Sequence, residues 1–282
     1  MQAMVTLTSE ESKRLIAKAV SRMEAVKKAR EEGFIGFSLC TSAGYVIQEL
    51  LGVDKIDPSG YCCGFIYSGG SCSVKKAHRE KLLLLEKGKP RWLNFPEEDL
   101  TVAISAMDKD DIIIKSGNVM DPNGNVGVLL ASPDGGEAGA YLPHIMAKGI
   151  RLIVPMTLNK TVPVPLTRIL SCMGISKFRK DRVTGMACGM LPLDGLVVTE
   201  TDAFRYLFGV TAVPVAMGGI GSGNGTVSLV LTGDDHHVES AWQAVNEIKG
   251  EPRLKNYLSN CNDCENARGE PGSAVCSTRL KG

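Results

Sequence analysis

Residues 110–117 read Asp-Asp-Ile-Ile-Ile-Lys-Ser-Gly, and this stretch decides the fold class. Three consecutive isoleucines are typical of a strand that is buried on both faces, and such strands occur in parallel sheets covered by helices. Charged residues precede the isoleucines and polar residues follow them, which limits the strand to its apolar centre. The stretch therefore predicts a central strand whose carboxyl end carries Lys115.

Strands and helices are expected to alternate on both sides of this strand. The N-terminal part predicts one amphipathic helix over residues 9–32, with Ser9 as its N-cap and Gly33 as its stop. A weak helical pattern covers residues 77–87. Further strands are expected at 34–40, 65–69, 126–132 and 150–156, and further helices at 41–52 and 140–148. This order predicts an α/β fold with a mostly parallel sheet and helices on both faces.

The character of the sequence changes after residue 165. The order there is strand, helix, strand, strand, helix, and the strands are close enough in sequence for antiparallel pairing. This pattern indicates a smaller α+β unit of the ferredoxin-like type. Three parts are expected: an α/β main domain over 1–165, an α+β lid subdomain over 166–250 and a cysteine-bearing tail over 251–282.

The overall composition excludes several classes of partner. The 282 residues are 44% hydrophobic and 22% charged, which is ordinary for a globular protein. A net charge of +1 gives no reason to expect nucleic acid or an anionic membrane as partner. No apolar run approaches the roughly 20 residues of a membrane span, and the N-terminus lacks the apolar core of a signal peptide. We expect a cytoplasmic protein that binds a small anionic metabolite, and a homo-oligomeric state is left open.

The first candidate site follows the strand expected at 34–40. Cys40 ends that strand, and Thr41 and Ser42 open the next helix. Free amides at a helix N-terminus, together with nearby hydroxyls, favour phosphate. An ordinary helix cap is the alternative, and Cys40 is either a favoured thiolate or a small buried side chain.

A second candidate follows the triple-isoleucine strand. Lys115 and Asn118 lie where ligands bind in open α/β sheets, outside the carboxyl ends of the strands. Residues 121–124, Asp-Pro-Asn-Gly, predict a turn.

A third candidate is the glycine-rich stretch before the helix at 140–148. Asp134, Gly135 and Gly136 allow the backbone to approach a ligand closely. Glu137 is the carboxylate placed to act as a base or a nucleophile. The alternative is a connecting loop whose glutamate favours the helix dipole.

These stretches together resemble ribose-5-phosphate isomerase A and its superfamily, which includes glucosamine-6-phosphate deaminases and coenzyme A transferases. Residues 39–43 resemble the isomerase's phosphate loop, and 115–122 resemble its aspartate-rich loop through the shared Asp121-Pro122. Residues 135–139 resemble its glycine-rich stretch, and 150–160 its strand that closes with a Ser-Lys pair, here Asn159-Lys160. The resemblance implies a Rossmann-like sheet with a small lid.

The sequence also departs from the isomerase. Lys115 and Asn118 replace acidic residues, and no lysine lies near Val128, where the isomerase has its catalytic lysine. Isomerase activity on ribose 5-phosphate is therefore not expected.

The predicted function is binding of a phosphorylated or coenzyme A-type metabolite, with isomerase- or transferase-like chemistry at Glu137. Thr41, Ser42 and Lys160 would hold anionic oxygens, while Lys115 and Asn118 would orient the substrate. The first alternative is a non-catalytic ligand-sensing module, because the replaced acids remove proton-transfer groups and keep an anion site.

The second alternative is a metal protein. Cys261, Cys264 and Cys276 give three soft ligands that suit zinc or an iron–sulfur cluster. A fourth ligand would come from Cys72 or from the Cys62-Cys63 pair, and a reduced tail or a redox pair is the alternative. The glycine-rich run at 218–225 does not fit the dinucleotide fingerprint and predicts a hairpin loop.

Overall fold

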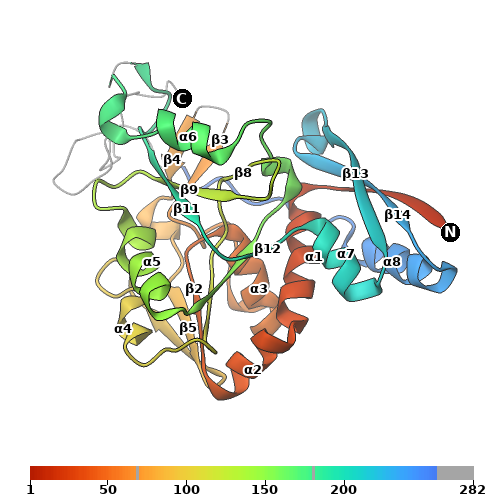
Figure 1. Ribbon diagram of the computed structural model, residues 1–282, viewed down its shortest axis with the longest axis horizontal. Helices are drawn as coiled ribbons and strands as arrows, with labels where there is room; N and C mark the ends of the chain where they lie inside the picture. The colour runs from red at the N-terminus through yellow and green to blue at the C-terminus, as the bar shows by residue number, and fades with distance from the viewer. Residues whose placement is uncertain (68–69, 180–181, 259–282) are drawn as a thin grey trace.

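The computed structural model describes residues 1–67, 70–179 and 182–258, and Figure 1 shows their arrangement. The largest sheet has six strands in the order β12-β10-β7-β2-β5-β6. Their bounds, in that order, are Leu196–Val198, Arg151–Pro155, Ile112–Ile114, Phe34–Phe37, Leu82–Glu86 and Lys89–Leu93.

Strand β7 lies inside this sheet, as the isoleucines predicted. It pairs in parallel with β2 on one side and β10 on the other, and β10 pairs in parallel with β12. Ile112, Ile113 and Ile114 are all 0% exposed. Because four neighbouring strands are parallel, their carboxyl ends meet at one edge of the sheet. This carboxyl edge is formed by residues 38–42, 115–118, 156–160 and 199–200.

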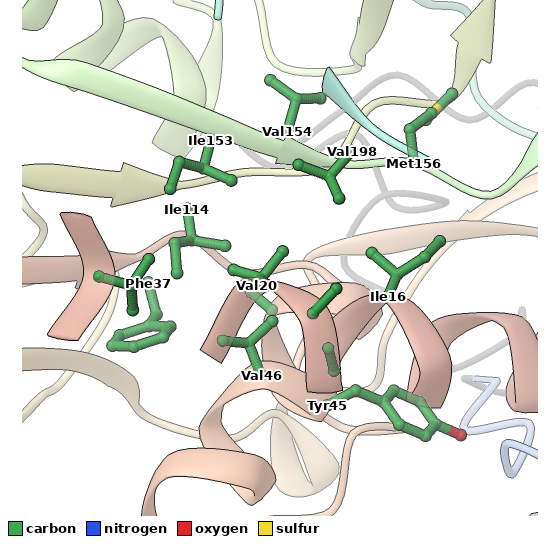
Figure 2. Packing of buried hydrophobic residues seen from close by; sticks show 14 of the residues in the cluster. Ile16, Val20, Phe37, Tyr45, Val46, Ile114, Ile153, Val154, Met156 and Val198 are labelled. Atoms are coloured by element: carbon green, nitrogen blue, oxygen red, sulfur yellow. The ribbon is translucent and has the colours of Figure 1, made fainter. Parts of the chain in front are cut away.

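Helices cover both sides of the six-stranded sheet. Figure 1 shows α1 (Ser9–Arg22), α2 (Glu24–Glu32) and α3 (Thr41–Leu51) on one side, with α4 (Thr101–Ile104) and α5 (Gly136–Lys148) on the other. Helix α1 packs against both α3 and β10. In Figure 2, Ile16 and Val20 of α1 lie between Val46 of α3 and the strand residues Ile114 and Val198. This core holds the four parallel strands in place below their carboxyl edge.

A second, three-stranded sheet is antiparallel and includes the N-terminus. Its order is β1-β14-β13, with bounds Gln2–Leu7, Thr226–Thr232 and Thr211–Gly218. It packs with α7 (Glu200–Phe208) and α8 (Asp235–Ile248). Strand β1 pairs along its whole length with β14, from Gln2 beside Thr232 to Leu7 beside Val227. The hairpin predicted around residues 218–225 is confirmed by the antiparallel pairing of β13 with β14.

Smaller elements complete the described part of the chain. A three-stranded antiparallel sheet has the order β11-β9-β8, with bounds Gly189–Leu193, Val126–Leu130 and Val119–Met120. Strands β3 (Gly64–Tyr67) and β4 (Gly70–Ser73) pair with each other, and α6 (Leu166–Cys172) packs against β11. Short 3₁₀ helices lie at η1 (Val53–Lys55), η2 (Lys76–His78), η3 (Leu158–Lys160), η4 (Ile175–Lys177) and η6 (Gly221–Gly223).

The mixed α/β class is confirmed, but the predicted Rossmann-like, mostly parallel sheet is not. Strand β5 pairs antiparallel with both β2 and β6, and the three smaller sheets are antiparallel throughout. Strand β9, expected in the parallel sheet, pairs with β8 and β11 instead. A Rossmann-like, mostly parallel sheet therefore stays a prediction. Among the described helices, none is long and apolar enough to cross a membrane.

Two local predictions were wrong. The helix expected over 9–32 is divided at Met23, and its N-cap is Thr8, whose hydroxyl accepts from Glu11 N while Glu11 accepts from Thr8 N. The helix expected over residues 77–87 is absent, because η2 ends at His78 and Leu82–Glu86 form β5. The leucines of β5 are fully buried between β2 and β6, and this tertiary burial overrides the helix preference of leucine and lysine.

The strands after residue 165 are distributed over three sheets. Strand β11 pairs with β9, β12 pairs with β10, and only β13 and β14 belong to the sheet that includes β1. The pairings thus connect the expected lid, 166–250, closely to the expected main domain.

Candidate functional site

The carboxyl edge gathers polar side chains from all four parallel strands. This follows from the topology, since loops after parallel strands converge at one edge. The residues that follow β2, β7, β10 and β12 there include Ser38, Cys40, Lys115, Ser116, Thr157, Lys160, Thr199 and Glu200.

A buried ion pair lies at the centre of this edge. Lys115 follows β7 and is 5% exposed, while Glu137 in the first turn of α5 is 4% exposed. Lys115 Nζ lies 3.4 Å from Glu137 Oε2, and Ser38 Oγ donates to the same oxygen at 2.7 Å. Burial disfavours the charge on Lys115, but the combined attraction of Glu137, Cys40 and Cys63 outweighs it and raises the pKa of Lys115. Glu137 Oε1 has no hydrogen-bond partner in the described structure.

The glycine-rich stretch positions Glu137. Gly135 has φ +85° and Gly136 has φ +57°, values that favour glycine. A Cβ atom on Gly135 would lie 2.9 Å from Gly139 Cα. Asp134 is exposed and accepts hydrogen bonds from Gly136 N and Ser132 Oγ. Asp134, Gly135 and Gly136 therefore shape the turn that begins α5.

Lys160, in η3, has a different environment from Lys115. Its Nζ donates to the carbonyl oxygen of Gly117 at 2.9 Å and to Ser116 Oγ at 3.3 Å, both neutral acceptors. Within the described residues, no carboxylate lies within 4.0 Å of this amine, whereas Lys115 has Glu137. Burial and then the nearby charge of Lys13 lower the pKa of Lys160 to about 8. The residue as a whole remains partly exposed.

A second acid and base lie close to Lys160. Lys13 of α1 is 6% exposed, its Nζ donates to Ser9 Oγ at 2.6 Å, and burial lowers its pKa. Glu200, in the first turn of α7, is 0% exposed and accepts from Leu158 N at 3.0 Å. Burial raises the pKa of Glu200, and its charge acts on both Lys13 and Lys160.

Sequence reasoning missed Lys13 and Glu200. A lysine within an amphipathic helix reads as part of the solvent-facing side, so Lys13 carried no signal. Glu200 did carry one, because it follows a strand and begins a helix, as the residues around Cys40 and Lys115 do.

Two of these lysines lack a close carboxylate. Lys115 has Glu137 at 3.4 Å, whereas neither Lys160 nor Lys13 has a carboxylate within 4.0 Å among the described residues. An ammonium in surroundings of low polarity gains stability from a nearby anion. Lys160 is therefore the partly exposed cation at this edge that a bound anion would stabilise.

Cys40, Thr41 and Ser42 lie at the same edge. Cys40 is the N-cap of α3, and its Sγ accepts a hydrogen bond from Ser116 N at 3.2 Å. Ser116 thus contacts both Cys40 and Lys160. Thr41 is partly exposed, and Ser42 Oγ is buried without a hydrogen-bond partner in the described structure.

The side-chain oxygen of Asn118 is used in a hydrogen bond within the fold. Its Oδ1 accepts from Leu129 N at 2.9 Å and ties the loop after β7 to β9. The turn predicted at 121–124 is present, since Asp121 accepts from Asn123 N and Asn125 N. Desolvation opposes the charge of Asp121, but bonds from Asn125 and Leu166 prevail and lower its pKa to about 2.

The metal prediction falls on residues that the structure does not describe. Cys261, Cys264 and Cys276 lie outside the described residues. Within 1–67, 70–179 and 182–258, no group of three or more His, Cys, Asp or Glu side chains is arranged to hold a metal ion. Cys62 and Cys63 are free thiols, and burial raises the pKa of Cys62 to about 12 and of Cys63 to about 11, while Cys72 is a buried residue of β4.

A surface cleft of about 620 Å³ lies away from this edge, between α1, α3 and residues 247–255. Its Arg14 is already paired with Glu49 and Glu251, at 2.9 and 2.8 Å. Because two carboxylates already neutralise Arg14, this cleft is a weaker candidate for an anionic ligand than the carboxyl edge.

Comparison of the chain with protein-family models, curated proteins and solved structures gives no match. The resemblance to the ribose-5-phosphate isomerase and coenzyme A transferase superfamily therefore stays a prediction from the sequence.

The depressed pKa of Lys160 predicts how its removal changes stability with pH. Between pH 8 and 10.5 the unfolded chain holds a proton on this lysine that the folded chain has released, so folding is favoured as the pH rises. Lys160→Met removes this titration. We expect the melting temperature of the variant, relative to wild type, to change little from pH 7 to pH 8 and to fall from pH 8 to pH 10, because in that window wild type gains up to about 1.4 kcal/mol per pH unit.

The control is Lys55→Met, which removes an exposed lysine. Its difference from wild type should not vary over the same pH range in differential scanning calorimetry. A pH-independent difference for Lys160→Met would show that Lys160 has an ordinary pKa.

The buried pair predicts a strong coupling between its two members. Glu137→Gln leaves the Lys115 ammonium buried without a carboxylate, and we expect a loss of about 3–5 kcal/mol in the free energy of unfolding. Glu137→Gln combined with Lys115→Met should recover part of this loss in urea titrations. Strictly additive effects of the two substitutions would mean that the pair does not interact.

Proposed function

We propose that this protein binds a small metabolite with a phosphate, carboxylate or coenzyme A-type anionic group at its carboxyl edge. The observation that carries the proposal is Lys160, a partly exposed ammonium in a desolvated setting with neutral oxygens as its only hydrogen-bond acceptors in the described structure. An anion at this point would supply the missing negative charge, and Lys160 is partly exposed whereas Lys13 and Lys115 are buried.

Neighbouring groups support the same assignment. Thr41 and Ser42 begin α3 beside Cys40, and the buried hydroxyl of Ser42 has no hydrogen-bond partner in the described structure. Free amides in the first turn of a helix add a partial positive charge. In this proposal Thr41, Ser42 and Lys160 hold the anionic oxygens, while Lys115 and Asn118 shape the site from the loop after β7.

Glu137 is the candidate for catalysis at this site. Its Oε1 has no partner in the described structure and could accept a substrate proton, or attack an acyl group, once a ligand reaches it. Its ion pair with Lys115 and its burial favour the second candidate, a ligand-sensing module, because both hold the carboxylate away from solvent. Full turnover by Glu137→Gln on a substrate found by binding would exclude the catalytic role of Glu137.

A thermal-shift panel tests the binding proposal. The panel compares inorganic phosphate, sugar phosphates and coenzyme A at constant ionic strength. A ligand at about 100 times its dissociation constant adds roughly 2.7 kcal/mol of stability, which is about 5–10 °C for a chain of this size. We expect such a shift for at least one class with wild type and with Lys55→Met, and its loss with Lys160→Met, which lacks the cation.

Lys160→Arg serves as a second variant, because it keeps the positive charge and should retain part of the shift. An equal thermal shift in wild type and in Lys160→Met would show that the ligand does not bind at Lys160. Absence of any shift in wild type would contradict anion binding altogether.

A further inference from the structure

The amine of Lys160 has the surroundings of a nucleophile as well as those of a counter-charge. Its two hydrogen-bond acceptors are the neutral oxygens of Gly117 and Ser116, so no carboxylate of the described structure forms a hydrogen bond or ion pair with it, and Glu200 acts on it only through its more distant charge. Lys13 and Lys115 are both close enough for their charges to oppose that of Lys160. A lysine that is desolvated and lies beside other cations loses its proton readily, and its free amine adds to carbonyl groups.

Lys115 differs from Lys160 because it has a carboxylate partner, and Lys13, whose acceptors on Ser9 are also neutral, differs in its burial. Lys115 is 5% exposed and its proton is held by Glu137 at 3.4 Å. Lys13 is 6% exposed and its amine is bonded to Ser9. Lys160 is partly exposed, so of the three lysines it is the one that lies nearest to solvent.

We propose that Lys160 forms an imine with a small aldehyde or ketone that also carries a phosphate or carboxylate group. The proposal rests on the proposed function, since the anionic group of the ligand is what the carboxyl edge would recognise. It narrows the substrate class from anionic metabolites in general to anionic carbonyl compounds.

The reaction consumes no oxidant or reductant. The lone pair of the neutral Lys160 amine attacks the carbonyl carbon, and the carbonyl π electrons move to the oxygen. A proton passes from nitrogen to that oxygen, for which Ser116 Oγ, 3.3 Å from Nζ, is placed as a relay. After a second proton, taken up from the solvent, reaches the hydroxyl group, the nitrogen lone pair forms the C=N bond, the C–O bond breaks and water leaves. The protonated imine keeps a positive charge beside the anionic group of the ligand.

Reductive trapping tests the proposal on the full chain. Glyceraldehyde 3-phosphate or pyruvate is added at pH 7 with sodium cyanoborohydride, and labelled peptides are quantified by mass spectrometry. A lysine with a pKa of about 8 has roughly 300-fold more neutral amine at this pH than one at 10.5. We expect the initial rate of labelling at Lys160 to exceed that at exposed lysines by about 100-fold, and Lys55→Met to label like wild type.

The variant Lys160→Arg separates imine formation from anion binding. The variant keeps the charge but has no amine that can form a stable imine, so it should lose the fast label and retain part of the phosphate-induced thermal shift. Labelling of exposed lysines without a preference for Lys160 would overturn the imine. If phosphate still stabilises wild type in that case, the anion-binding proposal is retained without the imine. If phosphate does not stabilise wild type, both proposals are wrong.

Discussion

The ion pair between Lys115 and Glu137 is the interaction on which the proposed site depends. It joins the carboxyl end of β7 to the first turn of α5. Both side chains of the pair are buried. A buried ammonium without this carboxylate would be strongly unfavourable. Because Glu137 is committed to Lys115, it does not compensate Lys160, and the edge is left with a cation that has no carboxylate of its own in the described structure.

Both proposals for Lys160 follow from this single imbalance. The protonated amine gains from a bound anion, and the deprotonated amine is favoured in the absence of one. Near pH 8 the two forms are of similar abundance. A ligand that brings an anionic group and a carbonyl group together would use both properties in sequence, first for recognition and then for bond formation.

The sequence predicted the part of this arrangement that depends on local pattern. Three isoleucines placed β7 inside the sheet, and the residues after it drew attention to Lys115. The pattern could not show that β1 pairs with β14 more than 200 residues away, or that burial would turn the leucines of β5 into a strand. Such pairings are set by tertiary packing, which has no local signature.

The same limit applies to the candidate site. Lys115 and Glu137 were expected at the site because each follows a predicted strand or precedes a predicted helix, and Lys160 was expected there only from the resemblance to the isomerase. Lys13 was missed because only the packing of α1 against α3, α7 and β10 buries it. Asn118 was expected to face a ligand, yet its side chain bonds to β9, a contact that depends on the antiparallel sheet.

The most direct test is an NMR titration of Lys160, observed through ¹³C-labelled lysine side chains and assigned with Lys160→Arg, with and without inorganic phosphate. The account predicts a pKa of about 8 that rises when phosphate is added, because the anion stabilises the protonated amine. A pKa near the ordinary value of 10.5, unchanged by phosphate, would show that the Lys160 amine is neither desolvated nor part of an anion-binding site.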